Sequence, residues 1–306
     1  MDWTAYESTQ HAPARNLAWE DALLESRGKG PAVFFLYRND ACVVIGRNQN
    51  PWREARTEAG LPVFRRRSGG GTVYQDQGNL NWSFMTGRDA WIVDDALDFV
   101  ASALGRLGLE PERDPRGALF LGGGKICGTA RRYFGPSVLI HGTLLVSSDL
   151  GALRDSLAGF RSAEDRAIAS VPSPVRNLAD AMPGLTVDTV RGALFAELAD
   201  RYGPVRPADP EEALSRESWT DREREHGSWE WVYGSTLPFA LPLGRDGTGP
   251  FLRVREGRIV GLGDPEDHQG PGALPDARLG RFLEAWKGRP LDPEMLAAAR
   301  GWMNGR

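Results

Sequence analysis

The pattern of apolar and polar residues predicts a chain in which helices and strands are mixed. Apolar residues recur at helical spacing in three segments, 16–26, 97–107 and 187–202. Each segment ends close to a glycine, which is a common helix stop. Runs rich in β-branched and aromatic residues predict strands at 33–37, 42–45, 63–64, 72–74, 80–85 and 138–146. The elements follow without a regular βαβ order, which favours an α+β fold over a doubly wound sheet.

Two parts of this strand pattern carry more specific expectations. The runs 33–37 and 42–45 are separated by Arg38-Asn39-Asp40, and so short a cluster of turn formers predicts a hairpin. In the run 138–146, His141-Gly142 breaks the apolar pattern, so we expect an interrupted strand.

The last fifth of the chain predicts a small second domain. Residues 204–227 are rich in charge and proline and are expected to be a surface connection, and 241–250 is the best candidate linker. Behind the linker we expect a hairpin and two helices, at 251–260, 279–286 and 293–302. We therefore expect a large α+β domain over residues 1–242 and a small α+β domain over residues 243–306.

Composition excludes several classes of protein. The formal net charge of -4 argues against a nucleic-acid binder with a broad basic face. The N-terminus lacks a signal-peptide pattern, and no run approaches the roughly 18 apolar residues of a membrane span, so we expect a cytoplasmic protein that contacts no membrane. The two cysteines, Cys42 and Cys127, form neither a disulfide framework nor a zinc ribbon, and the four histidines form no metal cluster.

Arg65-Arg66-Arg67-Ser68-Gly69-Gly70-Gly71-Thr72 is the first candidate for chemistry. Glycine backbone N–H groups can surround an anion, and neighbouring arginines add charged donors. The alternative from this segment alone is a flexible turn between strands.

Lys125 stands in the second candidate, Gly122-Gly123-Gly124-Lys125-Ile126-Cys127-Gly128. Leu119 and Ile126 stand where a P-loop needs glycine and a hydroxyl residue, so that motif is excluded. A lysine between glycines can reach a phosphate or a carboxylate as a flexible point charge. By itself, the segment fits an exposed loop lysine better than a ligand-binding one.

Two further groups remain open between chemistry and structure. The stretch from Gln75 to Asn81 offers amides and the carboxylate of Asp76, which suit a nucleotide or Mg²⁺, but it also fits a polar turn around Gly78. His141 lies in an apolar run, where a histidine is more often a core residue than a ligand. The chain has no GxSxG motif, which disfavours a serine hydrolase.

Taken in order, these motifs resemble those of the lipoate–protein ligase A family. The matching segments are Arg65 to Asn79, Lys125 to Ala130 and His141 to Leu145, with further landmarks at Val43 to Trp52 and Trp229-Glu230-Trp231. The resemblance covers residues 15–240, and the C-terminal segment fits the small accessory domain of that family. It implies the α+β catalytic fold shared with biotin ligases and related to class II synthetases.

The resemblance also implies a reaction and a set of site residues. Lipoate or octanoate would react with ATP, in the presence of Mg²⁺, to form an acyl-adenylate, and a lysine of a carrier protein would then take the acyl group. Lys125 is expected to be catalytic and to contact both substrates. The expected ATP-binding residues are Arg66, Gly71, Thr72, Val73, Tyr74, Asp76 and Asn79. The expected acyl-binding residues are Ser68, Gly69, Gly70, Gly128, Ala130 and His141, and no residue is expected to be a resident metal ligand. The implied carriers are the lipoyl domains of 2-oxoacid dehydrogenase E2 subunits and the glycine-cleavage H protein.

The sequence departs from the family pattern at a few positions. Gln75 stands where histidine is usual, Arg67 and Cys127 stand where serine is usual, and residues 114–117 show no clean Arg-Asn-Asp motif. Three alternatives therefore stay open: an ATP-independent octanoyl or lipoyl transferase with a nucleophilic cysteine, a biotin ligase, and a non-catalytic binding protein.

Overall fold

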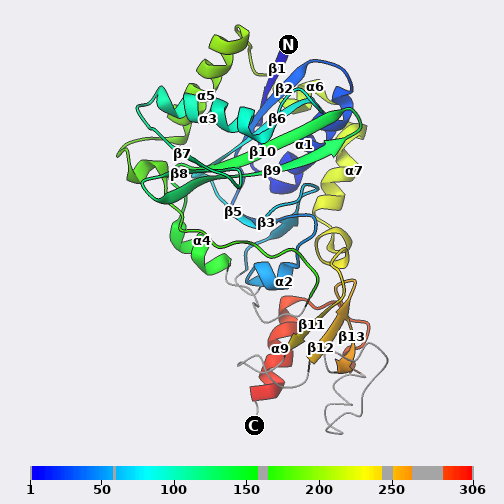
Figure 1. The fold of residues 1–306 in the computed structure, drawn as a ribbon. Coiled ribbons are helices and arrows are strands. Elements are labelled where there is room, and N and C mark those ends of the chain that lie inside the picture. Colours follow the sequence, from blue (N-terminus) through cyan, green and yellow to red (C-terminus); the bar gives the residue numbers. More distant parts are fainter. Residues whose placement is uncertain (1, 58–59, 158–164, 243–250, 264–284, 305–306) are drawn as a thin grey trace.

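The computed structural model describes residues 2–57, 60–157, 165–242, 251–263 and 285–304. A seven-stranded mixed sheet lies at its centre, in the order β1-β2-β6-β10-β9-β8-β7 (Figure 1). Its strands are β1 (Trp3–Glu7), β2 (Ala32–Tyr37), β6 (Asn79–Gly87), β7 (Glu112–Asp114), β8 (Ala118–Leu121), β9 (Gly124–Phe134) and β10 (Ser137–Leu145). A three-stranded sheet, in the order β4-β3-β5, consists of β3 (Cys42–Ile45), β4 (Val63–Arg65) and β5 (Val73–Gln75). Sheets and helices are mixed as expected, so the α+β prediction is confirmed.

Helices of three kinds surround these sheets. The α-helices are α1 (Pro13–Arg27), α2 (Pro51–Glu54), α3 (Val93–Gly105), α4 (Leu150–Ser156), α5 (Val187–Tyr202), α6 (Pro210–Ala213), α7 (Arg216–His226) and α9 (Pro293–Asn304). The described residues also contain a 3₁₀ turn, η2 (Leu178–Asp180), and a π-helix, η3 (Glu230–Gly234). Within the ranges described, none of the helices is long and apolar enough to cross a membrane.

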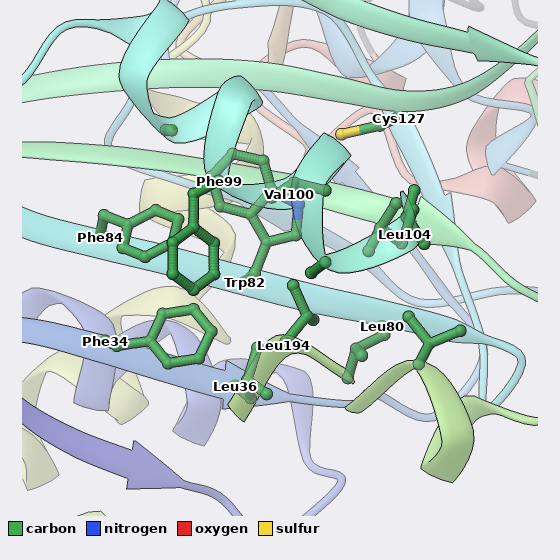
Figure 2. Close-up of a cluster of buried hydrophobic side chains, with 14 of the residues drawn as sticks. Phe34, Leu36, Leu80, Trp82, Phe84, Phe99, Val100, Leu104, Cys127 and Leu194 are labelled. Atoms are coloured by element: carbon green, nitrogen blue, oxygen red, sulfur yellow. The ribbon is translucent and has the colours of Figure 1, made fainter. Parts of the chain in front are cut away.

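One face of the large sheet packs against α3 and α5. Along β6, Leu80, Trp82 and Phe84 alternate with polar residues, so these three side chains point to the same face. They join Phe34 of β2 and Phe99 of α3 in a buried cluster (Figure 2). Burying this aromatic surface supplies much of the stability of the domain.

The opposite face of the sheet is covered by α1 and α7. Here Phe35 and Tyr37 of β2 pack with Trp19 of α1 and Trp219 of α7. The helix expected at 16–26 is confirmed as α1, but the expectation for 204–227 is wrong. That segment contains α7, which is a packed helix rather than a surface connection. The spacing of apolar residues did not predict this helix, because Trp219 alone supplies most of its buried apolar surface.

Two other local expectations are wrong. The runs at β2 and β3 do not form a hairpin, because β2 pairs with β1 and β6 in the large sheet whereas β3 pairs with β4 and β5. Turn-forming residues mark a change of direction, but they do not specify which strands pair. The strand β10 also runs through His141-Gly142 without a break. A Cβ atom at Gly142 would lie 2.5 Å from the ring of Trp82, so glycine allows the close crossing here.

The C-terminal part contains a second small sheet, in the order β11-β12-β13, with strands β11 (Phe239–Pro242), β12 (Phe251–Arg255) and β13 (Arg258–Gly263). The hairpin expected at 251–260 and the helix expected at 293–302 are confirmed as β12–β13 and α9. The linker expected at 241–250 is wrong for its first two residues, Leu241 and Pro242, which belong to β11, and its remainder lies outside the described residues, as does most of the helix expected at 279–286. Since β11 pairs with β12, we propose to divide the chain ahead of β11 rather than at 242/243. Trp52 of α2 packs into the core of this part, and its indole N–H donates to the carbonyl of Leu291 at 2.9 Å.

Candidate active site

A cavity of about 360 Å³ lies on the α1 face of the large sheet. Both sheets contribute to its wall, together with α1 and residues 168–173. Nine of the expected site residues line it: Arg66, Gly70, Gly71, Thr72, Val73, Lys125, Gly128, Ala130 and His141. Segments more than 70 residues apart in sequence therefore meet in one place.

The glycine loop is ordered by the arginine that precedes it. The guanidinium of Arg66 donates to the carbonyls of Gly69 and Gly71 at 2.6 and 2.7 Å. It also donates to the Ser68 hydroxyl at 2.9 Å and to the carbonyl of Val44 at 3.2 Å. Gly70 adopts φ +84°, which favours glycine. Arg66 thus binds the loop itself, and the loop is not a flexible turn.

A buried polar chain continues from this loop to α1. The Ser68 hydroxyl lies 2.7 Å from Nε2 of His141, and Nδ1 of His141 lies 2.9 Å from the carboxylate of Glu20. Because the carboxylate only accepts, Nδ1 of His141 carries a proton and donates it to Glu20, and Nε2 forms the hydrogen bond with the Ser68 hydroxyl. Burial by itself would raise the pKa of Glu20, but His141, Ser83 and Arg66 hold it below the usual value.

Glu20 therefore makes stability depend on pH. A carboxyl group with a lowered folded-state pKa stabilises the protein above its unfolded pKa of 4.5, and this contribution is lost as the pH falls through the folded value. We expect Glu20→Gln to reduce the free energy of unfolding at neutral pH, and the difference from wild type to shrink on acidification. Urea unfolding at neutral pH and at about pH 4 and below measures both effects. Glu217→Gln, at an exposed position of α7, should show neither. A difference that grows towards low pH would contradict the assignment.

Lys125 lies near one end of β9. Its backbone N–H donates to the carbonyl of Pro174 at 2.8 Å, and its carbonyl accepts from Arg176 at 3.0 Å. The side chain crosses Gly128, where a Cβ atom would lie 3.2 Å from Nζ. The ammonium group lines the cavity, where its charge acts on Asp114, and within the described part of the chain it makes no hydrogen bond or ion pair. Lys125 is thus a strand residue with a cationic group available to a ligand, and not an exposed loop lysine.

Other expected site residues lie around the cavity without lining it. Ser68 and Gly69 belong to the loop just described. Tyr74 is buried in β5, and burial next to Asp76 raises its pKa to about 12. Asp76 accepts the backbone N–H groups of Gly78 and Asp149, and Asn79 donates to Asn81 at 3.0 Å. These contacts support a structural turn for this stretch.

Residues 165–176 are a part of the site that sequence reasoning missed. The Ser170 hydroxyl accepts the backbone N–H of Thr72 at 2.9 Å and the side-chain N–H of Gln49 at 3.0 Å. The N–H of Thr72, expected to hold ATP, is therefore engaged by Ser170 in this structure. No motif in the sequence marks this segment.

Glu20 was also missed, but a signal existed. Glu20 shares the buried stripe of α1 with Leu17 and Leu24, and a carboxylate on an apolar stripe requires a partner. Its partners come from β6 and β10, and helical spacing does not identify those.

Neither cysteine lies in a position where its thiol could act as a nucleophile in the cavity. Cys42 is fully buried in β3, and burial raises the pKa of its thiol. Cys127 contributes to the aromatic cluster on the α3 face (Figure 2), where burial raises its pKa to about 12. A thiol needs its thiolate form to attack an acyl group.

The cavity wall also includes an acid, Asp114, whose pKa is lowered by its hydrogen bonds with Arg116. Among the described residues, no group of three or more histidine, cysteine, aspartate or glutamate side chains could hold a metal ion.

Comparisons with known proteins identify the family of this chain. A family model described as the lipoyl protein ligase A/B catalytic domain matches residues 12–199, which is more than half of the chain. The chain belongs to this family. It is similar to LipL1 of P. falciparum in complex with lipoate, with 19% identity, a TM-score of 0.66, and coverage of 99% of this chain and 100% of that chain.

Two other solved structures share the fold over 76% of this chain at 24% identity. One is a lipoate-protein ligase A bound with ATP, which is covered to 98% with a TM-score of 0.62. The other belongs to an archaeal lipoylation system of Thermoplasma acidophilum, described as a bi-partite lipoate protein ligase and its E2 lipoyl domain, and is covered to 95% with a TM-score of 0.60.

Proposed function

We propose that this protein is an ATP-dependent lipoate–protein ligase. The observation that carries the proposal is the cationic group of Lys125 on the wall of the cavity, which also contains the glycine loop. Structural relatives described with lipoate and with ATP support both substrates. The relative described with its E2 lipoyl domain supports a lipoyl domain as the acceptor. Octanoate as a second substrate, the glycine-cleavage H protein as a second acceptor and a cytoplasmic location are further parts of the proposal.

The reaction has two steps. A carboxylate oxygen of lipoate attacks the α-phosphorus of ATP, which forms the mixed anhydride and releases pyrophosphate. The neutral amine of the acceptor lysine then attacks the acyl carbon, the bond from this carbon to the anhydride oxygen breaks, AMP leaves and the amine gives up a proton. Lys125 stabilises negative charge on the phosphate in the first step and on the acyl oxygen in the second. The glycine loop and Lys125 bring the two anionic substrates together.

An acyl-transfer assay tests this function. The purified protein is mixed with lipoate, ATP, Mg²⁺ and an apo lipoyl domain, and the mass of the domain is measured. We expect a mass increase by one lipoyl group only when ATP is present. Modification without ATP would indicate a transferase, and neither modification nor adenylate would indicate a binding protein. Biotin in place of lipoate serves as the control for a biotin ligase.

Replacing Cys127 separates the ligase from a cysteine-dependent transferase. We expect Cys127→Ser to retain the rate of carrier modification within about twofold, because this thiol faces the core and not the cavity. The hydroxyl group costs some stability in an apolar core, so the rate is measured well below the unfolding temperature. A rate loss of 100-fold or more in the folded variant, on the order of that for a lost nucleophile, would instead support the transferase.

A further inference from the structure

A chain of buried side-chain amides leads to the cavity. Nδ2 of Asn16 donates to Oδ1 of Asn39 at 2.8 Å, and Nδ2 of Asn39 donates to Oε1 of Gln75 at 2.6 Å. Nε2 of Gln75 then donates to Oδ1 of Asn81 at 2.7 Å. All four side chains are buried, and the last two belong to the cavity wall.

The direction of this chain is determined at its first member. Nδ2 of Asn16 also contacts the backbone carbonyls of Gln10 and Arg38, at 3.1 and 3.0 Å. Carbonyls only accept, so the amide of Asn16 presents its nitrogen to them, and its two N–H groups are shared among these two carbonyls and Oδ1 of Asn39. Each following amide must then accept a hydrogen bond with its oxygen and donate one with its nitrogen. Gln75, at the position where the family usually has histidine, is one of these amides.

At the cavity, one hydrogen-bond donor in this chain of amides has no partner within the described ranges. Oδ1 of Asn81 accepts from both Gln75 and Asn79, and the chain through Gln75 determines its orientation. Nδ2 of Asn81 has no hydrogen-bond partner among the described residues, although the side chain is only 2% exposed. A buried N–H group without a partner is costly, so an occupant of the cavity that offers an acceptor here gains affinity.

This donor lies away from the reacting end of the cavity. Asn81 pairs with Thr143 of β10, which pairs in turn with Gly128 of β9, next to the ammonium of Lys125. Paired residues point to the same face, and two strand spacings separate Gly128 from Asn81 by about 10 Å. An acyl group with its carboxylate at Lys125 therefore brings its distal part, and not its carboxylate, to Asn81.

We propose that Asn81 is a specificity-determining residue that donates a hydrogen bond to an acceptor near the distal end of the acyl chain. The cavity then selects medium-chain acids with a sulfur or oxygen atom at that end, such as the dithiolane of lipoate, over the saturated chain of octanoate. Sulfur is a weak acceptor, but a hydrocarbon leaves the donor unpaired. The inference rests on the proposed function for the orientation of the acid.

Binding of free acids, measured by calorimetry without ATP or carrier, tests this selection. We expect wild type to bind lipoate about tenfold more tightly than octanoate, as one satisfied buried donor implies. Asn81→Asp keeps both accepted hydrogen bonds and removes the donor. The ratio of the affinity for lipoate to that for octanoate should therefore fall to about twofold or less. The added charge acts on both acids alike, which is why the ratio is the readout. Asn177→Asp is the matched control, because Asn177 is a buried amide bonded to Ser148 that does not line the cavity, and its ratio should stay at the wild-type value.

A second measurement uses wild type alone and does not depend on the folding of a variant. An ω-hydroxy derivative of octanoate should bind several-fold more tightly than octanoate, because its oxygen can accept from Asn81. Equal binding of lipoate and octanoate, binding of neither acid, or an unchanged ratio in Asn81→Asp would overturn the inference. The binding measurement contains neither ATP nor carrier, so it is independent of the acyl-transfer assay. If the affinity ratios are as expected but the carrier is not modified in that assay, the ligase proposal is wrong and the role of Asn81 is retained.

Discussion

Replacement of Lys125 by alanine is expected to lower lipoate-dependent ATP–pyrophosphate exchange by on the order of 100-fold or more, the usual loss for a donor that stabilises transition-state charge. The ammonium lines the cavity, lies beside Gly128, and has no partner among the described residues. It is therefore available to the charge that develops on the α-phosphate. For the same reason its removal should leave the free energy of unfolding within about 0.5 kcal/mol of wild type.

Two further variants test the shape of the cation and provide the control. Lys125→Arg keeps the charge but replaces a compact ammonium by a planar fork, so exchange should remain well below wild type. Lys29→Ala is the control, because Lys29 is an exposed residue in the loop after α1. Exchange near the wild-type rate in folded Lys125→Ala would exclude the proposed role.

Replacement of Arg65 by methionine is expected to destabilise the protein by about 3–5 kcal/mol, as when a buried charged donor is lost from its acceptors. Arg65 is fully buried, and burial lowers its pKa to about 10. Its guanidinium donates to the carbonyls of Arg47 and Gln49 at 2.9 and 2.7 Å. On its other side it donates to the carbonyl of Val232 at 2.6 Å.

The loss should be large because these acceptors are backbone carbonyls that a methionine leaves unpaired. They belong to two segments, the loop after β3 and the π-helix η3, which leads into β11. Hydrogen exchange should therefore increase in both segments. Equilibrium urea unfolding measures the free energy, and Arg216→Met, whose side chain is 79% exposed, is the control with an expected change within about 0.5 kcal/mol. A loss below about 1 kcal/mol in Arg65→Met would show that these hydrogen bonds contribute little.

Adjacent arginines in one motif thus have different roles. Arg65 connects η3 to the loop after β3, Arg66 orders the glycine loop, and Arg67 pairs with Asp21 of α1 at 2.8 Å. Their sequence predicted an anion-binding segment, yet all three guanidinium groups bind the protein itself. Of the other described cations on the cavity wall, Arg116 is paired with Asp114, and the ammonium of Lys125 makes no hydrogen bond or ion pair.

Much of the local structure was predictable because it depends on neighbouring residues. Helical spacing predicted α1 and α5, and turn residues at Glu256-Gly257 predicted the β12–β13 hairpin. α7 was missed because most of its residues are charged, and its place against α1 depends on Trp219. The false hairpin between β2 and β3 has a related cause, since a short apolar run is compatible with either sheet.

The candidate site was predictable as a set of segments, but not as an arrangement. The order of the glycine loop, Lys125 and His141 indicated one ligase site, and the structure brings all three to one cavity. The sequence could not indicate that Ser170 contacts Thr72, or that Gln75 orients Asn81. Hydrogen-bond partners far apart in the chain leave no periodic pattern.

The pattern of apolar and polar positions therefore determined the class of fold and the alternation that gives β6 one apolar and one polar face, and the ordered motifs indicated the segments that carry chemistry. Only the tertiary structure decided which polar groups satisfy one another and which are left for a ligand. The reason is physical: propensity and periodicity act between near neighbours, whereas the pairing of a buried donor depends on every strand and helix that packs around it. The sequence motifs already indicated Lys125 as a ligand-facing group, whereas the role proposed for Asn81 could be inferred only when the groups around it had been paired.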